Sequence, residues 1–244
     1  MLSSCSEQSL SINESLHGTA PPSVQFFVLL EYRGHWPRKV SLDALELAPD
    51  IAIRLDSLLN AKANSRLLLI RKPRPEASPK IFVVDTLNQV SRWAYLDAEW
   101  EPNGRDGFQP SPNAMTLVCT HGIRDACCSR KGGAFFRALN KMASSMVWQS
   151  SHLGGHRFAA TAIHFPSGRL YGRLLPSDAA HFIQPTDGVL LDKFRGTTRY
   201  DRPTQFAEIV LLKSGRQSLD FIDQSHLDND NVRVRFRSEN GVVS

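Results

Sequence analysis

The sequence has few cysteines and no long apolar run, and each shortage excludes a class of protein. Four cysteines in 244 residues are too few for the disulfide framework of a small secreted protein. No segment approaches the roughly 18 apolar residues that a membrane-spanning helix needs. The first residues lack a basic start followed by an apolar stretch, so we expect no secretory signal. Together these absences predict a cytoplasmic protein that has no membrane partner.

The charged residues also lack the marks of nucleic-acid binding. The net charge is +5, but the basic residues are scattered and no recognition motif accompanies them. We therefore expect no nucleic-acid partner. A basic face that docks an acidic redox protein is the better interpretation of this charge.

The chain does contain two pairs of metal-binding side chains at regular spacings. Cys119 and Cys128 are separated by eight residues, and His152 and His156 by three, all within a span of 38 residues. A mixed set of two thiolates and two imidazoles favours zinc or a [2Fe–2S] cluster. The residues alone leave both metals open, and a buried, inert cysteine is the simplest alternative for any single thiol.

Hydrophobic patterning divides the chain into two α/β halves after an arm, at residues 1–23, that we predict to be disordered. In the N-terminal half, residues 24–110, strands are predicted at 24–32, 66–70 and 80–84, with a helical pattern at 42–59 interrupted by Pro49. Residues 102–114 are rich in Pro, Gly and Asn and form the best boundary between the halves.

The second half, residues 111–244, starts with a short apolar strand that ends at Cys119. A cysteine-containing loop follows, and residues 134–146 carry apolar residues at helical spacing. Further on, the pattern predicts strands at 170–173 and 232–236 and helices at 176–182 and 204–213. A strand, a cysteine loop and a helix begin a thioredoxin-like unit, so the predicted fold class is α/β.

The motifs CTHGIRDACC, SSHLGGHRFAAT and PSGRLYGRL resemble the sucrase/ferredoxin-like family, whose members are thioredoxin-like ferredoxins. In the N-terminal half, LLEYRGHWPRKV followed by LLLIRKP is similar to the opening pattern of bacterial members. The resemblance covers roughly residues 24–236.

This resemblance implies a [2Fe–2S] cluster with Cys119 and Cys128 as thiolate ligands and His152 and His156 as imidazole ligands. Cys127 departs from many relatives; the family spacing selects Cys128, although a loop could present either thiol. His121, Arg124 and Asp125 either adjust the cluster and its loop or simply form a tight turn. We recognise no paired carboxylates in a glycosidase context, so the sequence gives no indication of the sugar hydrolysis that the word sucrase suggests.

The predicted function is one-electron transfer by an iron–sulfur protein of the ferredoxin type. Neutral imidazoles remove negative charge from the iron, which gives a middle potential that is coupled to pH. No GxGxxG motif follows a strand, so the redox partners would be a separate reductase and a separate acceptor.

Two alternatives remain open from the residues. A thiol oxidoreductase would use Cys119, Cys127 or Cys128, although the CxxC pair typical of that chemistry is missing. A structural zinc module has an acceptable ligand set, but zinc-finger cysteines usually lie two to four residues apart. An electron carrier is therefore the preferred interpretation, ahead of a substrate-converting enzyme.

Overall fold

The computed structural model describes residues 4–111, 113–183, 189–216, 219–227, 231–239 and 241–244. The helices are α1 (Cys5–Ser11), α2 (Pro49–Asn60), α3 (Gly133–Met142), α4 (Ala179–Ile183) and α5 (Arg202–Lys213). The strands are β1 (Phe26–Glu31), β2 (Ser65–Arg71), β3 (Lys80–Asp85), β4 (Val90–Tyr95), β5 (Gln109–Pro110), β6 (Met115–Cys119), β7 (Val147–Ser150), β8 (Ala162–Phe165), β9 (Arg169–Tyr171), β10 (Phe194–Thr197), β11 (Asp220–His226), β12 (Val232–Ser238) and β13 (Gly241–Val243).

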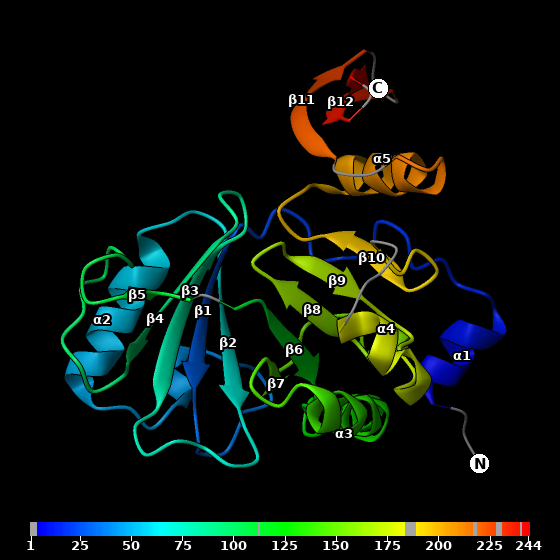
Figure 1. Ribbon diagram of the computed structural model, residues 1–244. Helices are drawn as coiled ribbons and strands as arrows, with labels where there is room; N and C mark the ends of the chain where they lie inside the picture. Colours follow the sequence, from blue (N-terminus) through cyan, green and yellow to red (C-terminus); the bar gives the residue numbers. More distant parts are fainter. Residues whose placement is uncertain (1–3, 112, 184–188, 217–218, 228–230, 240) are drawn as a thin grey trace.

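A mixed sheet of ten strands runs through both halves, in the order β10-β9-β8-β6-β7-β2-β1-β3-β4-β5 (Figure 1). Strands β1 and β2 are parallel, with α2 between them in the chain, and β3 and β4 follow antiparallel beside β1. Strands β6, β7, β8 and β9 repeat this arrangement around α3. The sheet thus contains two thioredoxin-like units, side by side.

The two units meet where β2 pairs with β7 in antiparallel fashion, Ile70 opposite Ser150 and Arg71 opposite Gln149. This joint lies directly before the two predicted histidine ligands. In each unit, one face of the strands packs against a helix, α2 in the first unit and α3 in the second. The opposite faces of the two units contribute to one shared core. Phe27 of β1 packs against Phe165 of β8, with ring centroids 4.8 Å apart.

Strands β1 and β6 are buried along their whole length, and their side chains alternate between two apolar faces. Val28 and Leu30 face α2, whereas Phe27 and Leu29 face the core shared by both halves. A strand covered on both faces is apolar along its length, as expected for the interior of an α/β sheet. In β6 the same alternation places Cys119 in the shared core.

The N-terminal arm is the clearest correction to the sequence-based expectation. The first 23 residues were expected to be disordered, but Cys5–Ser11 form helix α1, which packs against the helical turn His156–Phe158. The Glu7 carboxylate accepts a hydrogen bond from the Ser4 backbone N–H at 2.7 Å, and this bond fixes the first turn of the helix.

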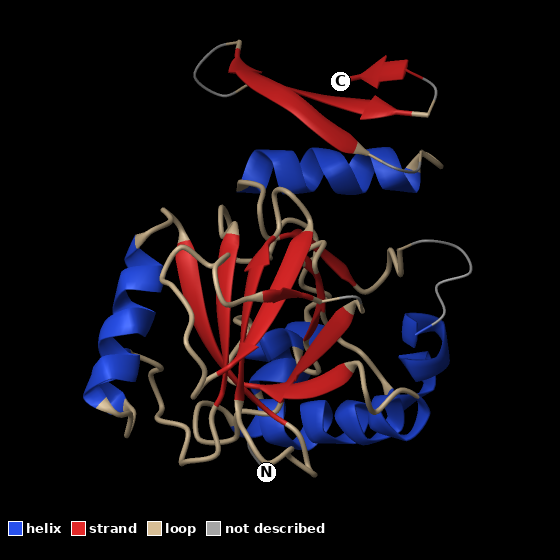
Figure 2. Ribbon diagram, turned by 60° about the vertical axis from the view of Figure 1, so that its left-hand side comes forward, coloured by secondary structure: helices blue, strands red, loops and turns tan. Residues whose placement is uncertain are grey.

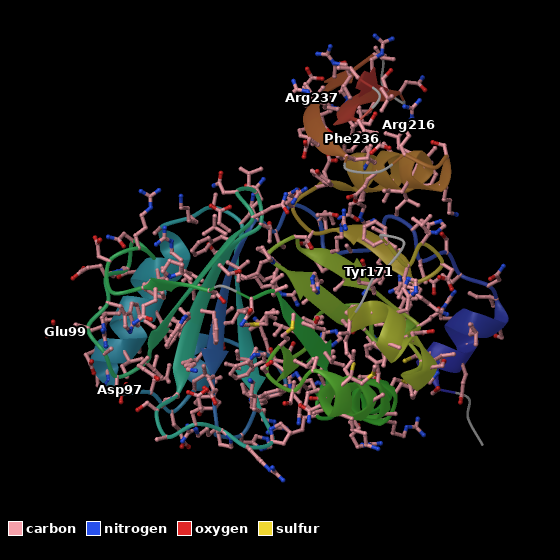
Figure 3. The ribbon with its side chains drawn as sticks, viewed as in Figure 1. Asp97, Glu99, Tyr171, Arg216, Phe236 and Arg237 are labelled. Carbon is pink, nitrogen blue, oxygen red and sulfur yellow. The ribbon has the colours of Figure 1, made fainter. Side chains whose placement is uncertain are left out.

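The C-terminal strands form a separate sheet, β11-β12-β13, which lies on α5 away from the main sheet (Figure 2). Phe236 points from β12 toward α5 and is fully buried (Figure 3). Tyr171 of β9, labelled in the same view, packs edge-on against Phe182 of α4 at 5.0 Å. In the part of the chain that the structure describes, every helix is too short or too polar to cross a bilayer.

Most predicted strands and helices of the two halves are present. The helical pattern at 42–59 is split by Pro49 into a turn at Leu42–Ala44 and helix α2, which begins at the proline. Strands β4, β5, β7, β8, β10, β11 and β13 were not predicted individually. The predicted boundary near residue 110 falls between β5 and β6, and the autonomy of the two halves stays a prediction.

Candidate metal centre

The end of β6 and the loop that follows it hold the two cysteines that were predicted as ligands. Cys119 ends the strand, and Cys128 opens a π-helical turn, Cys128–Gly132, that runs into α3. Asp125 fixes the start of this turn, because its carboxylate accepts a hydrogen bond from Cys127 N at 2.8 Å and its carbonyl accepts one from Cys128 N at 3.1 Å. Both cysteine side chains are buried.

Gly132 allows the turn to lie against the strand. A Cβ atom built at this position would come within 1.9 Å of the Cys119 carbonyl oxygen, a contact that no side chain permits. The absence of a side chain at Gly132 therefore brings the helical turn, and with it Cys128, close to Cys119.

The histidines lie in a loop whose backbone bonds to the guanidinium groups of two arginines. Arg66 of β2 donates to the carbonyl of His152 at 2.6 Å and to that of Leu153 at 3.2 Å. Arg195 of β10 donates to the carbonyl of Gly154 at 2.9 Å. Gly154 and Gly155 both have positive φ angles, which the predicted turn between the ligands requires.

Three of the four predicted ligands converge. His152 Nδ1 lies 3.8 Å from Cys119 Sγ and 3.7 Å from Cys128 Sγ. The three ligand atoms all lie within 4.8 Å of one another, so these side chains can hold a metal. We call Cys119, Cys128 and His152 the inner group.

His156 lies beside the inner group and belongs to a second one. The His152 and His156 rings are 6.0 Å apart, centroid to centroid. His156 Nδ1 is 2.9 Å from Asp125 Oδ2 and 3.1 Å from Cys5 Sγ. Cys5, Asp125 and His156, the outer group, also place their ligand atoms within 4.8 Å of one another. The four predicted ligands therefore fall in two adjacent places.

The thiols of the inner group are strongly polarised. A hydrogen bond from Cys128, supported by His152, holds the pKa of Cys119 well below its usual range against the opposing effect of burial. The same bond and burial raise the pKa of Cys128. These opposite shifts favour the thiolate form at Cys119, and a cation in the site would also favour deprotonation of Cys128.

Two arginines lie near Cys119. Arg195 is buried and Arg66 is half-buried. Burial lowers both pKa values, that of Arg195 to about 9, while the Cys119 charge opposes the decrease. Arg195 also donates to Thr19 Oγ1 at 3.0 Å and to the Thr19 carbonyl. Both guanidinium groups bring positive charge toward the sulfur ligands from the side of the histidine loop.

His121 connects the site to the N-terminal half. Its ring lies edge-on to Trp36 at 5.8 Å, and its Nδ1 accepts a hydrogen bond from His152 N at 3.2 Å. Burial lowers the pKa of His121, so that the ring is neutral and can accept this bond. Asp125 bonds the loop backbone, as expected if it fixes the cysteine loop. The Arg124 side chain is exposed.

Sequence analysis missed Cys5, Ser6, Arg66 and Arg195 as neighbours of the site. Cys5 comes from α1, and the pattern Ser4-x-x-Glu7, a capping-box signature, could have indicated that helix. The arginines carried no local signal, because an isolated basic residue is usually exposed.

A comparison with known protein families finds a match for most of the chain. The model of the sucrase/ferredoxin-like family matches residues 16–196. The chain belongs to this family. The matched range contains all four predicted ligands and both thioredoxin-like units, but it ends before α5 and the C-terminal sheet.

Two yeast proteins, both named altered inheritance of mitochondria protein 32, are similar to parts of the chain. The protein of Meyerozyma guilliermondii is 30% identical over 137 residues, which are 50% of this chain and 46% of the relative. The protein of Debaryomyces hansenii is 28% identical over 95 residues, 34% of this chain and 35% of the relative. The chain therefore aligns with less than half the length of these relatives.

Proposed function

We propose that this member of the sucrase/ferredoxin-like family is a one-electron carrier with a [2Fe–2S] cluster held by Cys119, Cys128, His152 and His156. The observation that carries the proposal is the convergence of two buried thiols and one imidazole, with a second imidazole directly beside them. When bound, the cluster supplies reversible one-electron chemistry.

The division of the ligands between two places favours a two-metal cluster over a single zinc ion. A tetrahedral zinc ion needs four ligand atoms around one point. His156 Nδ1 lies against Asp125 and Cys5, outside the inner group. In a cluster with two irons the four protein ligands are divided between two metal atoms and need not converge on one point, so these positions favour a cluster over a single zinc ion.

The surroundings of the ligands favour a middle potential. Imidazole ligands carry no charge, and the guanidinium groups of Arg66 and Arg195 near Cys119 stabilise the electron-rich, reduced state. The shared core, which includes Trp148 beside the cysteines, excludes water from the thiolate side. Phe158 is also fully buried, under Arg195 at 5.0 Å.

A basic pocket beside the centre fits an acidic redox partner. It has a volume of about 410 Å³ and is lined by Ser6 and Leu10 of α1, Ala134, Ala159, Leu174, Leu175, Pro176 and the cations Arg130, Lys131, Arg173 and Lys193. Arg130 and Lys131 belong to the turn that begins at Cys128. We propose that an acidic reductase or acceptor docks here and exchanges electrons at short range.

The decisive experiment is the analysis of protein purified without oxygen. We expect about two irons and two labile sulfides per chain, a red-brown colour and an EPR signal after reduction. Stoichiometric zinc without sulfide would contradict the electron-carrier proposal and support a structural zinc module. Metal-free, colourless protein with reactive thiols would favour the thiol oxidoreductase.

We keep the cytoplasmic location as a prediction. The relatives are named after the inheritance of mitochondria, so a mitochondrial location is the specific alternative. A fluorescent fusion to the full-length protein, imaged with a mitochondrial marker, separates the two compartments.

A further inference from the structure

The N-terminal helix brings a second pair of thiols together, outside the predicted ligand set. Cys5 Sγ of α1 lies 3.5 Å from Cys127 Sγ. The Ser6 hydroxyl donates a hydrogen bond to Cys127 Sγ at 3.4 Å. Cys127 is buried, whereas Cys5 is partly exposed, so solvent reaches the pair from the α1 side.

Polar contacts hold the N-terminal segment in this position. Arg173 donates to the carbonyl of Ser9 at 3.1 Å and to that of Glu14 at 2.7 Å. Arg157 contacts the Glu14 carboxylate at 2.7 Å. Both arginines belong to the C-terminal half. Their contacts with the N-terminal segment therefore hold Cys5 near Cys127 independently of any contact between the two thiols.

We propose that Cys5 and Cys127 are a redox-active pair whose disulfide fastens α1 over the outer side of the metal centre. A disulfide has an S–S length of about 2.05 Å, so the two sulfurs need to approach by roughly 1.5 Å. The proposal requires that rotation of the two side chains closes this gap. The bond would join residue 5 to residue 127 and hold α1 beside His156.

The oxidant is a hydroperoxide, and the reaction balances. The first thiolate attacks a peroxide oxygen; the O–O bond breaks, and an alcohol or water leaves with the proton of that thiol. The sulfenic acid formed is attacked by the second sulfur, which displaces water and forms the S–S bond. Two thiols and one hydroperoxide thus give one disulfide, one alcohol or water molecule, and one further water molecule. A dithiol reductant reverses the change.

The geometry favours this chemistry over hydrolysis. Cys5, His156 and Asp125 resemble a catalytic triad in composition, but Cys5 Sγ and Asp125 Oδ2 both approach the same ring nitrogen, Nδ1. A triad needs the nucleophile and the carboxylate on opposite nitrogens of the imidazole. The partner that remains for Cys5 is the Cys127 thiol.

The test uses the full chain with Cys119→Ser and Cys128→Ser, which leaves Cys5 and Cys127 as its two cysteines. After hydrogen peroxide treatment, we expect most molecules to lose two hydrogen atoms and to give a cross-linked peptide containing both residues. Dithiothreitol should restore the starting mass. The triple variant that adds Cys5→Ser is the matched control and should gain oxygen atoms instead.

A second measurement uses wild-type protein purified without oxygen, in case the double substitution prevents folding. Peptide mapping of the oxidised wild type should give the same cross-link, absent from Cys5→Ser. The oxidised wild type should resist proteolysis within α1, and its Tm should rise by about 5–15 °C over the reduced form.

Oxygen addition without a cross-link, disulfide-linked dimers, or a Cys119–Cys128 disulfide alone would overturn the proposal. So would stoichiometric zinc bound by Cys5, Asp125 and His156 that persists in the reduced double variant. Because the double variant lacks the cluster ligands, these results do not depend on the [2Fe–2S] proposal, which the iron and sulfide analysis tests separately.

Discussion

The two halves of the main sheet share one topology but differ at the ends of corresponding strands. Strand β6 ends at Cys119, and His152 is the second residue after β7. The corresponding strand β1 ends at Glu31, and the second residue after β2 is Pro73. The buried Glu31 carboxylate accepts a hydrogen bond from Lys80 N at 3.0 Å and serves the structure of its own half. The thioredoxin-like scaffold therefore also forms in a half that has no candidate ligands, and the candidate ligands lie at a strand end and in the loops of the other half.

The half without ligands still contributes to the site. Its Arg66 bonds the backbone of the histidine loop, and its Trp36 packs against His121. One half therefore supplies the ligands, and the other positions the loop that carries two of them.

The largest expected effect is the loss of the cluster from the ligand-bearing half. Cys128→Ser should abolish the iron and sulfide content, because serine is a poor substitute for a buried thiolate. Cys127→Ser is the matched control, one residue away, and should keep a nearly unchanged visible spectrum. If the two variants exchange these results, Cys127 is the ligand.

The second largest effect is expected from adding a methyl group at Gly132, which lies against the Cys119 carbonyl. Gly132→Ala places a Cβ on the Cys119 carbonyl, and we expect a loss of about 1–3 kcal/mol in the free energy of unfolding and poorer cluster retention. Gly133→Ala meets only the end of the Arg137 side chain at 3.5 Å and should be neutral or slightly stabilising. Urea denaturation of both variants measures the difference. Equal stabilities would show that the turn is free to move.

The third prediction concerns the histidine ligand that lies outside the inner group. His156→Cys should retain a cluster with a lower midpoint potential, because a thiolate adds negative charge at the iron. In the wild type, the midpoint potential should fall as the pH rises, by up to about 59 mV per pH unit, the limit for one proton per electron. The midpoint potential of the His156→Cys variant should depend less on pH. Protein-film voltammetry from about pH 5 to 10 tests this, and a flat wild-type potential would remove the histidines from the ligand set.

A smaller effect is expected from the half without ligands. Arg66→Met removes two hydrogen bonds to the histidine loop and should cost about 1–3 kcal/mol in stability while the metal content stays near that of the wild type. Lys62→Met, on an exposed turn of the same half, should change little. Complete loss of iron in Arg66→Met would mean that this half does more than position the loop.

The smallest effect is a pH dependence of stability far from the ligands. Burial, and then the charge of Arg169, lowers the pKa of His164, whose Nδ1 lies 3.1 Å from Thr116 Oγ1. The unfolded chain takes up this proton near pH 6.5, whereas the folded protein does so at lower pH. Stability should therefore decrease as the pH falls below about 6.5, and less so in His164→Gln. Identical acid sensitivity of both proteins would show that His164 is not responsible.

The sequence predicted the parts of the site that depend on local spacing. The positions of Cys119 and His152 follow from strand ends and a turn, and the structure brings these two side chains together. The proximity of Cys5 to Cys127 could not be predicted, because 121 residues separate them and no periodicity connects them. Strand β11 was missed since its side chains are mostly exposed and do not alternate.

The hydrophobic core takes residues from both halves, and we expect it to make the two units unfold together as a single cooperative domain on heating. Phe82 of the first unit packs on Trp148 of the second at 5.5 Å, and Phe27 packs on Phe165. We therefore expect one calorimetric transition in place of two, despite the duplicated topology. A polypeptide of residues 111–244 alone would expose one side of this core to water. We expect it to aggregate and not to fold as an independent ferredoxin domain.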